Sequence, residues 1–295
     1  MEALQSLVHG LPPDLPASVF VVLHVAPRSR SFLPEILTDA GPLPAFHPDD
    51  GAPIEHGRIY VARPDQHLFI EPGHVHLSFG PKEQHQRPCV NVSFRSAAAA
   101  YNDRVIGVVL TGQLDDGASG MWEIKRRGGL AIVQHPEEAA FPSMPLSVLR
   151  DIEVDYTVRL GEMGPLLARL SKEESGESAP VHRRQEMQPR ITDLTCPECR
   201  GTIWETPRGN GVEYRCRVGH SYSPRTMLAE HFAAQERTMW AAIVAMEEGA
   251  ALAQRLEQHL DPELRDKLRH EARQRQDQAA ALRRVLSERD AFAVD

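Results

Sequence analysis

VFVVLHVAP, residues 19–27, is a continuous run of β-branched and apolar residues interrupted only by a histidine near its end. IGVVL, residues 106–110, has the same character. Strands that are buried on both faces of a parallel sheet form such uninterrupted apolar runs, whereas half-exposed strands alternate between apolar and polar residues. The two stretches therefore predict strands that are buried on both faces of a parallel sheet, and they place His24 where the first strand leaves the sheet.

Short apolar runs alternate with amphipathic segments over the first 170 residues. The predicted strands are 19–25, 58–62, 68–70, 75–79, 104–111, 130–134 and 154–158, and the predicted helices are 2–9, 31–40, 91–102, 117–127 and 161–171. Strands separated by helices indicate an α/β domain with a doubly wound, mainly parallel sheet. Helix 2–9 nevertheless follows no strand in this sequence. The missing βα turn would open at the carboxyl edge of the sheet, where sites form.

Three further parts are predicted after this α/β domain, which covers 1–170. Residues 171–192 are polar and without periodicity, which indicates a linker. Residues 193–222 contain three of the cysteines and form a small module. Residues 223–290 have a helical pattern that is broken at Asp261 and the proline after it, a helix N-cap followed by the first helical position. Two helices joined by so short a connection predict an antiparallel helical hairpin.

Composition and charge limit the classes of partner. The net charge of −8 is unfavourable for nucleic acid, because binding phosphate requires a basic surface, and we expect no nucleic-acid partner. No apolar run approaches the roughly 20 residues that span a bilayer, so membrane insertion is not expected. No signal peptide is recognisable at the N-terminus either. We therefore expect a cytoplasmic protein.

Three of the four cysteines cluster with a histidine in CPEC and CRVGH. The candidate metal ligands are Cys196, Cys199, Cys216 and His220. Three thiolates and an imidazole at this spacing predict a zinc-ribbon-like site. Four protein ligands leave no position for water, so the zinc would be structural, not catalytic. The alternative is that these cysteines are simply buried, which is also the interpretation of the isolated Cys89.

A second candidate site lies in LTGQLDDGASG, residues 110–120, where a Gly/Asp-rich turn follows a buried strand. The carboxyl ends of parallel strands meet at one edge, so this turn is expected beside His24. An aspartate there would accept a hydrogen bond from the histidine Nδ1–H and stabilise the imidazolium that forms during catalysis. The alternatives are that Asp115 and Asp116 only shape the turn and cap a helix, and that His24 is a core residue.

Several stretches, in this order, resemble the catalytic domain of CheB-type protein-glutamate methylesterases: EALQSLVHGLP, FVVLHVAP, IYVARPDQHLFIE, RPCVNVSFRSAA, GVVLTGQLDDGASG, GGLAIVQ and PSMP. The resemblance covers roughly residues 1–170 and implies that family's fold. It also implies the hydrolysis of glutamyl methyl esters on chemoreceptor cytoplasmic helices by a serine–histidine–aspartate triad that needs no cofactor. On this sequence it assigns the histidine to His24 and the aspartate to Asp116, not Asp115.

The sequence departs from the family pattern at two points. The family serine lies in a GASAGG turn just ahead of the EALQ helix, and this sequence starts at Met1 without that turn. The strand and helix pattern lacks the same element. Gln113 stands where the family usually has a methionine associated with stabilising the oxyanion, and its amide can still donate a hydrogen bond. Ser6, Ser96 and Ser143 are not placed to substitute for the serine.

The resemblance leaves two functions open. The first is hydrolysis of receptor methyl esters, with His24 as general base and then acid. The second is a non-catalytic scaffold in a chemosensory pathway, which would bind the receptor or a chemoreceptor methyltransferase through the C-terminal module. Some methylesterase-like proteins carry a similar cysteine-containing tail, which favours an accessory module. A nucleophilic serine would distinguish the two functions.

Overall fold

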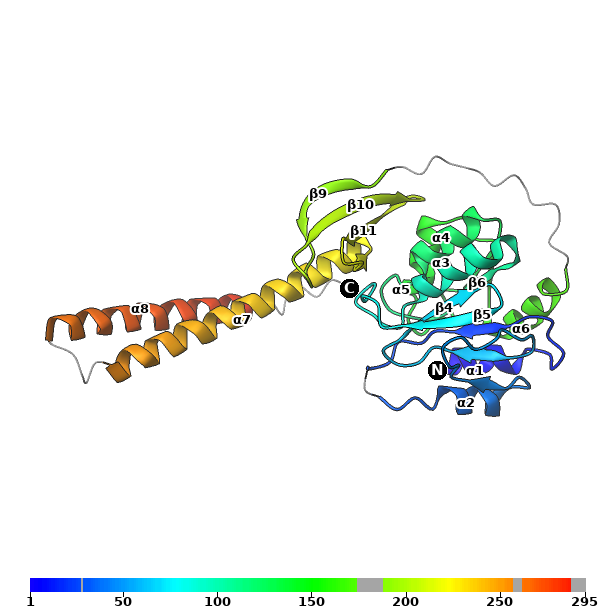
Figure 1. Ribbon diagram of the computed structural model, residues 1–295, viewed down its shortest axis with the longest axis horizontal. Helices are drawn as coiled ribbons and strands as arrows, with labels where there is room; N and C mark the ends of the chain where they lie inside the picture. The colour runs from blue at the N-terminus through cyan, green and yellow to red at the C-terminus, as the bar shows by residue number, and fades with distance from the viewer. Residues whose placement is uncertain (28, 174–187, 257–261, 288–295) are drawn as a thin grey trace. The chain divides into compact units, whose positions relative to one another are not determined.

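The computed structural model describes residues 1–27, 29–173, 188–256 and 262–287 (Figure 1). The chain divides into two compact units, Met1–Met227 and Leu228–Asp295. The first unit contains the α/β domain together with the cysteine-containing module, and the second contains helices. Among the described residues, no helix is both long enough and apolar enough to cross a membrane.

The α/β domain contains the predicted elements, and half of them are shorter than predicted. Its helices are α1 Glu2–His9, α2 Leu33–Ala40, α3 Val90–Tyr101, α4 Ala118–Arg126, α5 Ser143–Asp151 and α6 Leu160–Leu170, with a 3₁₀ turn at Asn102–Arg104. Its strands are β1 Val19–Val21, β2 Ala45–Phe46, β3 Ile59–Val61, β4 His67–Glu71, β5 His74–Ser78, β6 Ile106–Val109, β7 Leu130–Gln134 and β8 Tyr156–Val158. The sequence did not predict β2, which is very short, or α5, which has prolines at its start.

The parallel sheet that the apolar runs predicted is confirmed, and it is divided into two halves. One half has the order β1-β3-β2 and the other has the order β6-β7-β8, and all four pairings within the halves are parallel. Strands β4 and β5 form a separate antiparallel hairpin. Among the described residues no strand pairing joins the two halves, so β1 and β6 are both edge strands.

Each face of the sheet packs on its own apolar core. On strand β7, Ile132 belongs to a core with residues of α1, α2 and α6, whereas Ala131 and Val133 belong to a core with residues of α3, α4 and α5. Successive side chains of a strand point to opposite faces, so this division shows that the strand is covered on both sides. The continuous apolar runs in the sequence have this physical origin.

The cysteine-containing module is a four-stranded antiparallel sheet. Its strands are β9 Arg190–Thr195, β10 Thr202–Arg208, β11 Gly211–Cys216 and β12 Ser221–Tyr222, in the order β12-β11-β10-β9. Strand β9 begins at Arg190, within the range 171–192 that the sequence assigned to a linker. Most of that range lies outside the described residues.

Two long helices complete the chain, α7 Pro224–Leu256 and α8 Pro262–Ser287, and they run side by side (Figure 1). The predicted helix cap at Asp261 lies outside the described residues. Ala272 and Ala279 of α8 are buried at the seven-residue spacing typical of paired helices. An ion pair of 2.8 Å between Arg283 and Glu247 also links the two helices.

Candidate functional site

The structure brings His24 and Asp116 together at the carboxyl edge of the sheet. His24 follows β1, and Asp116 lies in the turn between β6 and α4. Nε2 of His24 lies 2.7 Å from Oδ2 of Asp116. The histidine side chain is 28% exposed and the aspartate side chain 3% exposed. The pair therefore has a buried carboxylate and an imidazole that solvent and a substrate can reach.

The nitrogen of His24 that contacts Asp116 differs from the expectation. We expected Nδ1 to contact the carboxylate, whereas Nε2 contacts it in the structure. Because the carboxylate is deeply buried, the imidazole reaches it with its distal end. An Nε2–H that donates to Asp116 fixes the neutral ring in the tautomer whose lone pair is on Nδ1. Nδ1 is thus the atom that can accept a proton from a nucleophile.

Asp116 accepts hydrogen bonds from several groups besides His24. The backbone N–H of Val90 lies 2.7 Å from Oδ2, and the backbone N–H of Asn91 lies 3.0 Å from Oδ1. The thiol of Cys89 donates to Oδ1 at 3.1 Å. Val90 and Asn91 begin α3, so the carboxylate also benefits from the positive end of that helix. Asp116 therefore caps α3 and orients His24 at the same time, which the sequence argument had treated as alternatives.

These contacts set the charge of Asp116. Burial by itself raises the pKa of this carboxyl group. The hydrogen bond to His24, the charge of His24 and the hydrogen bond from the Val90 N–H together outweigh burial, so the pKa of Asp116 is lowered. Asp116 is therefore ionised at neutral pH.

The pKa of His24 shifts in the opposite direction. Burial lowers the pKa of the imidazole, whereas the hydrogen bond to Asp116 and the negative charge of Asp116 raise it. The two contributions of Asp116 together outweigh burial, so the pKa of His24 is above 6.5. Asp116 thus stabilises the imidazolium, the form that His24 takes after accepting a proton.

We expect the His24 pKa to fall when Asp116 loses its charge. In residues 1–295, NMR titration of the imidazole should give a pKa above 6.5 for His24, and Asp116→Asn should lower it because burial then acts alone. A general base works only when neutral, so in an active chain the acid limb of kcat/KM should follow the same shift to lower pH. An unchanged pKa in the variant would show that Asp116 does not act on the ring.

The turn that carries Asp116 is held by residues that the sequence argument did not single out. Oδ1 of Asn91 accepts hydrogen bonds from the backbone N–H of Gly117 at 3.1 Å and of Gly120 at 2.6 Å. Gly117 has φ +100, a conformation that favours glycine. Leu114 has φ +63 and is 43% exposed. Non-glycine residues with a strained backbone, such as Leu114, concentrate at functional sites. Asn91 lies in the motif RPCVNVSFRSAA, but the sequence predicted no role for it.

A large apolar cavity extends from the His24–Asp116 pair between the two halves of the sheet. Its volume is about 1280 Å³, larger than the roughly 300–1,000 Å³ of small-molecule pockets. Residues 19–24 all line the cavity. Because successive side chains of a strand point to opposite faces of the sheet, a cavity that touches all of them must run along the edge of β1. Residues of β6 line the opposite side, and α1 and Met1 also contribute. The cavity therefore occupies the gap between the two edge strands.

The serines considered from the sequence do not reach His24. Ser96 donates to the backbone O of Ser93 and accepts from the backbone N–H of Ile70, so its hydroxyl belongs to the fold. Ser6 is exposed on α1, and Ser143 begins α5. Within the described part of the chain, no serine hydroxyl is hydrogen-bonded to the imidazole.

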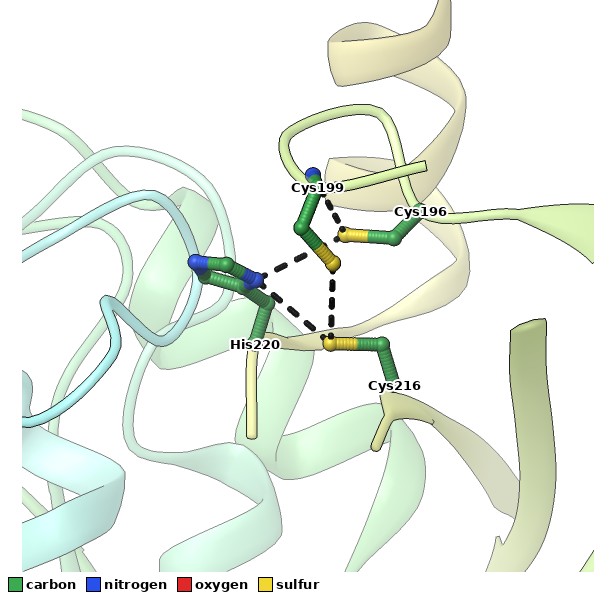
Figure 2. Close-up of side chains that lie close together, drawn as sticks. All are labelled: Cys196, Cys199, Cys216 and His220. Carbon is green, nitrogen blue, oxygen red and sulfur yellow. Dashed lines mark hydrogen bonds between the residues drawn. The ribbon is translucent and has the colours of Figure 1, made fainter. Parts of the chain in front are cut away.

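The four predicted metal ligands converge in the cysteine-containing module (Figure 2). Their ligand atoms all lie within 4.8 Å of one another. The sulfurs of Cys199 and Cys216 are 3.7 Å apart, and Nδ1 of His220 lies 3.4 Å from Cys216 Sγ and 3.6 Å from Cys196 Sγ. A tetrahedral zinc with bonds of about 2.3 Å to sulfur and about 2.05 Å to nitrogen requires edges of about 3.8 and about 3.6 Å. The donor set therefore fits zinc in both chemistry and size.

Outer contacts orient this cluster. Nε2 of His220 lies 3.3 Å from Oε2 of Glu198, and the hydroxyl of Tyr222 donates to Oε1 of Glu198 at 3.3 Å. A histidine ligand whose other nitrogen contacts a carboxylate is the usual arrangement around protein-bound zinc. Cys196 and Cys216 are buried. The surroundings of the cluster are therefore typical of a structural site.

Comparison with known proteins agrees with the fold of the α/β domain. Residues 1–167 match the family model described as CheB methylesterase. A crystal structure of the Thermotoga maritima CheB methylesterase catalytic domain is similar at a TM-score of 0.54 and 29% identity, over 57% of this chain and 92% of that one.

Relatives with the name protein-glutamate methylesterase/protein-glutamine glutaminase include one from Leptospira interrogans, whose name adds the word "putative", and one from Methanosarcina acetivorans. The relative from Leptospira interrogans is 34% identical over 173 residues, which are 58% of this chain and 90% of the relative. The relative from Methanosarcina acetivorans is 36% identical over 176 residues, which are 57% of this chain but 49% of the relative. The similarity thus covers 90% of a smaller relative and about half of a larger one.

Proposed function

The chain belongs to the CheB methylesterase family, and from that premise we propose that its α/β domain hydrolyses glutamyl methyl esters on the cytoplasmic helices of methyl-accepting chemoreceptors. The observation that carries the proposal is the 2.7 Å contact of His24 with the buried Asp116 at the mouth of the cavity. The names of the relatives also include glutaminase activity, and a glutamine side chain would react by the same acyl transfer with ammonia as the leaving group.

Each group of the pair has a defined role in the reaction. Nδ1 of His24 takes the proton of a serine hydroxyl, whose oxygen attacks the ester carbonyl and forms a tetrahedral intermediate. The imidazolium then gives that proton to the methoxy oxygen, and methanol leaves. Water, activated in the same way, hydrolyses the acyl-enzyme to the glutamate and the free serine. Asp116 stays ionised and stabilises the imidazolium throughout.

The turn beside the pair is suited to hold the oxyanion. Gly112, Gln113 and Leu114 line the end of the cavity beside His24. The backbone N–H groups of Gln113 and Leu114, or the side-chain amide of Gln113, would donate to the negative oxygen of the tetrahedral intermediate. Such donors stabilise charge that develops only in the transition state, which makes them effective.

The cavity supports a specific source for the serine. A strand that runs between β1 and β6, parallel to both, would join the two halves of the sheet and end at the edge where His24 and Asp116 lie. Met1 and α1 line the same cavity, so a strand that leads into α1 would run along it. We propose that the nucleophilic serine occupies the turn at the carboxyl end of such a strand.

We also propose that Cys196, Cys199, Cys216 and His220 bind one structural Zn²⁺. The purified protein should contain about one zinc per chain, and Cys199→Ser should release it and unfold the module. Metal binding supplies folding energy for small zinc modules, about 10–16 kcal/mol in zinc-finger peptides. Metal analysis and thermal denaturation would measure both effects.

Cys89 provides the matched control for this experiment, because it is a buried cysteine outside the cluster. Cys89→Ala should retain the full zinc content. A zinc content near zero in wild-type protein purified without chelator would contradict the proposal, as would equal loss in the two variants.

A further inference from the structure

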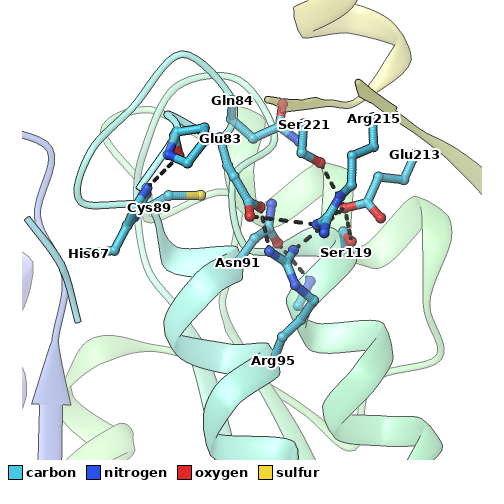
Figure 3. Close-up of polar contacts among 12 residues, drawn as sticks. His67, Glu83, Gln84, Cys89, Asn91, Arg95, Ser119, Glu213, Arg215 and Ser221 are labelled. Carbon is cyan, nitrogen blue, oxygen red and sulfur yellow. Dashed lines mark hydrogen bonds and ion pairs between the residues drawn. The ribbon is translucent and has the colours of Figure 1, made fainter. Parts of the chain in front are cut away.

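A network of charged residues joins the cysteine-containing module to the α/β domain (Figure 3). Arg95 of α3 forms ion pairs with Glu83 of the preceding loop and, at 3.5 Å, with Glu213 of β11. Arg215 of β11 pairs with Glu83 at 3.6 Å. The Glu213 side chain is 4% exposed, and the positive charges of Arg95 and Arg215 outweigh burial to lower its pKa. Breaking a buried pair leaves an uncompensated charge, so this network fixes the module on the domain.

One contact next to this network connects the metal cluster to the loop whose groups donate hydrogen bonds to Asp116. Ser221, the residue after the ligand His220, accepts a hydrogen bond of 2.7 Å from the backbone N–H of Gln84. The side-chain oxygen of Gln84 accepts from the backbone N–H of Ser223 at 3.0 Å. Gln84 is 3% exposed and belongs to the loop that leads to Cys89, whose thiol donates to Asp116. The position of the metal knuckle thus influences the position of that loop.

A second contact reaches the catalytic turn directly. The hydroxyl of Thr226, in the first turn of α7, donates to Oδ1 of Asp115 at 3.1 Å. Thr226 is 1% exposed and Asp115 is 3% exposed. The hydroxyl of Ser223, which follows β12, accepts from the backbone N–H of Thr226 at 3.1 Å. Asp115 precedes Asp116 in the chain, so this contact restrains the backbone that carries the catalytic carboxylate.

We propose that the metal-bound module positions Asp116, with Gln84 and Thr226 as the positioning residues. The two contacts act on the carboxylate by different routes, one through the loop that supplies its N–H and thiol donors and one through the turn that carries it. Loss of the metal would release β12 and the start of α7, and with them both restraints. The expected effect on the reaction rate rests on the proposed function. If the domain is an esterase, loss of the metal would lower its rate of ester hydrolysis.

The test measures the His24–Asp116 hydrogen bond itself. In residues 1–295, the His24 Nε2–H bonded to Asp116 should give a downfield proton signal in ¹H–¹⁵N spectra at low temperature. Thr226→Val should retain about one zinc per chain but weaken or shift this signal, and Thr226→Ser, which keeps the hydroxyl, should restore it. Chelation of the metal should have at least the effect of Thr226→Val. Thr192→Val is the control, because the Thr192 hydroxyl bonds to the backbone O of Ile203 within the module.

Activity adds a second readout in a chain that carries the serine strand. Thr226→Val should lower kcat about tenfold with little change in KM, the size of effect expected for one buried hydrogen bond, and Thr226→Ser should recover it. If such a chain releases no methanol while the His24 signal still responds to Thr226→Val and to chelation, the proposed function fails and the positioning role stands. If methanol is released but neither change affects the signal, the positioning role is wrong.

Discussion

A chain that places a strand ending in a GASAGG turn ahead of Met1 is expected to release methanol from methylated receptor about 10³ times faster, or more, than residues 1–295 alone. Removing one member of a catalytic triad commonly costs several powers of ten in rate, and residues 1–295 contain the proposed base and its proposed orienting carboxylate without that turn. The cavity of about 1280 Å³ between β1 and β6 is the space that the strand would fill.

The matched control is the same extended chain with alanine in place of the added serine. It should fill the cavity and stabilise the sheet to the same extent, so its melting temperature should match that of the serine version. Its methanol release should stay at the level of residues 1–295. Equal activity of the two extended chains would show that the added serine is not the nucleophile.

Asp116→Asn in the extended chain is the second large effect, and we expect it to lower kcat by about 10⁴, as the corresponding change does in a serine protease. The amide cannot stabilise the imidazolium, and its NH₂ group would favour the tautomer with the proton on Nδ1, the atom that must accept the proton of the serine. The loss should persist at high pH, because it comes from the tautomer as well as from the lowered pKa.

Asp115→Asn is the matched control for this substitution. The neighbouring aspartate is buried as well, but it contacts Thr226, not His24. Its effect on kcat should be much smaller than that of Asp116→Asn. A comparable loss in the two variants would mean that the shape of the turn, and not the hydrogen bond to His24, determines the rate.

The apolar runs predicted the parallel strands and their common edge because burial on both faces leaves a direct trace in the sequence. The same reasoning predicted the meeting of His24 with the Asp116 turn. It did not predict that Nε2 makes the contact, because the depth of the carboxylate under the start of α3 depends on packing. Helix α5 was missed because its prolines obscure the helical pattern, although proline is tolerated in the first turn.

The convergence of the three cysteines with His220 was predicted from their spacing alone, because CPEC and CRVGH are each local in sequence. The joint between the module and the domain was not. Gln84 and Ser223 are polar residues in unrelated loops, and their contact spans 139 positions without any periodic pattern. Asn91 was quoted within a motif, but its role depends on the φ +100 turn at Gly117, which only the folded chain shows.

The central claim is that His24 and Asp116 form a catalytic pair, and methanol release by the extended chain with and without His24→Ala tests it most directly. The account predicts that the alanine variant folds, binds methylated receptor with similar affinity and releases methanol no faster than the control that lacks the added serine. Equal rates of methanol release with histidine and with alanine at position 24 would contradict the account and would make His24 a core residue.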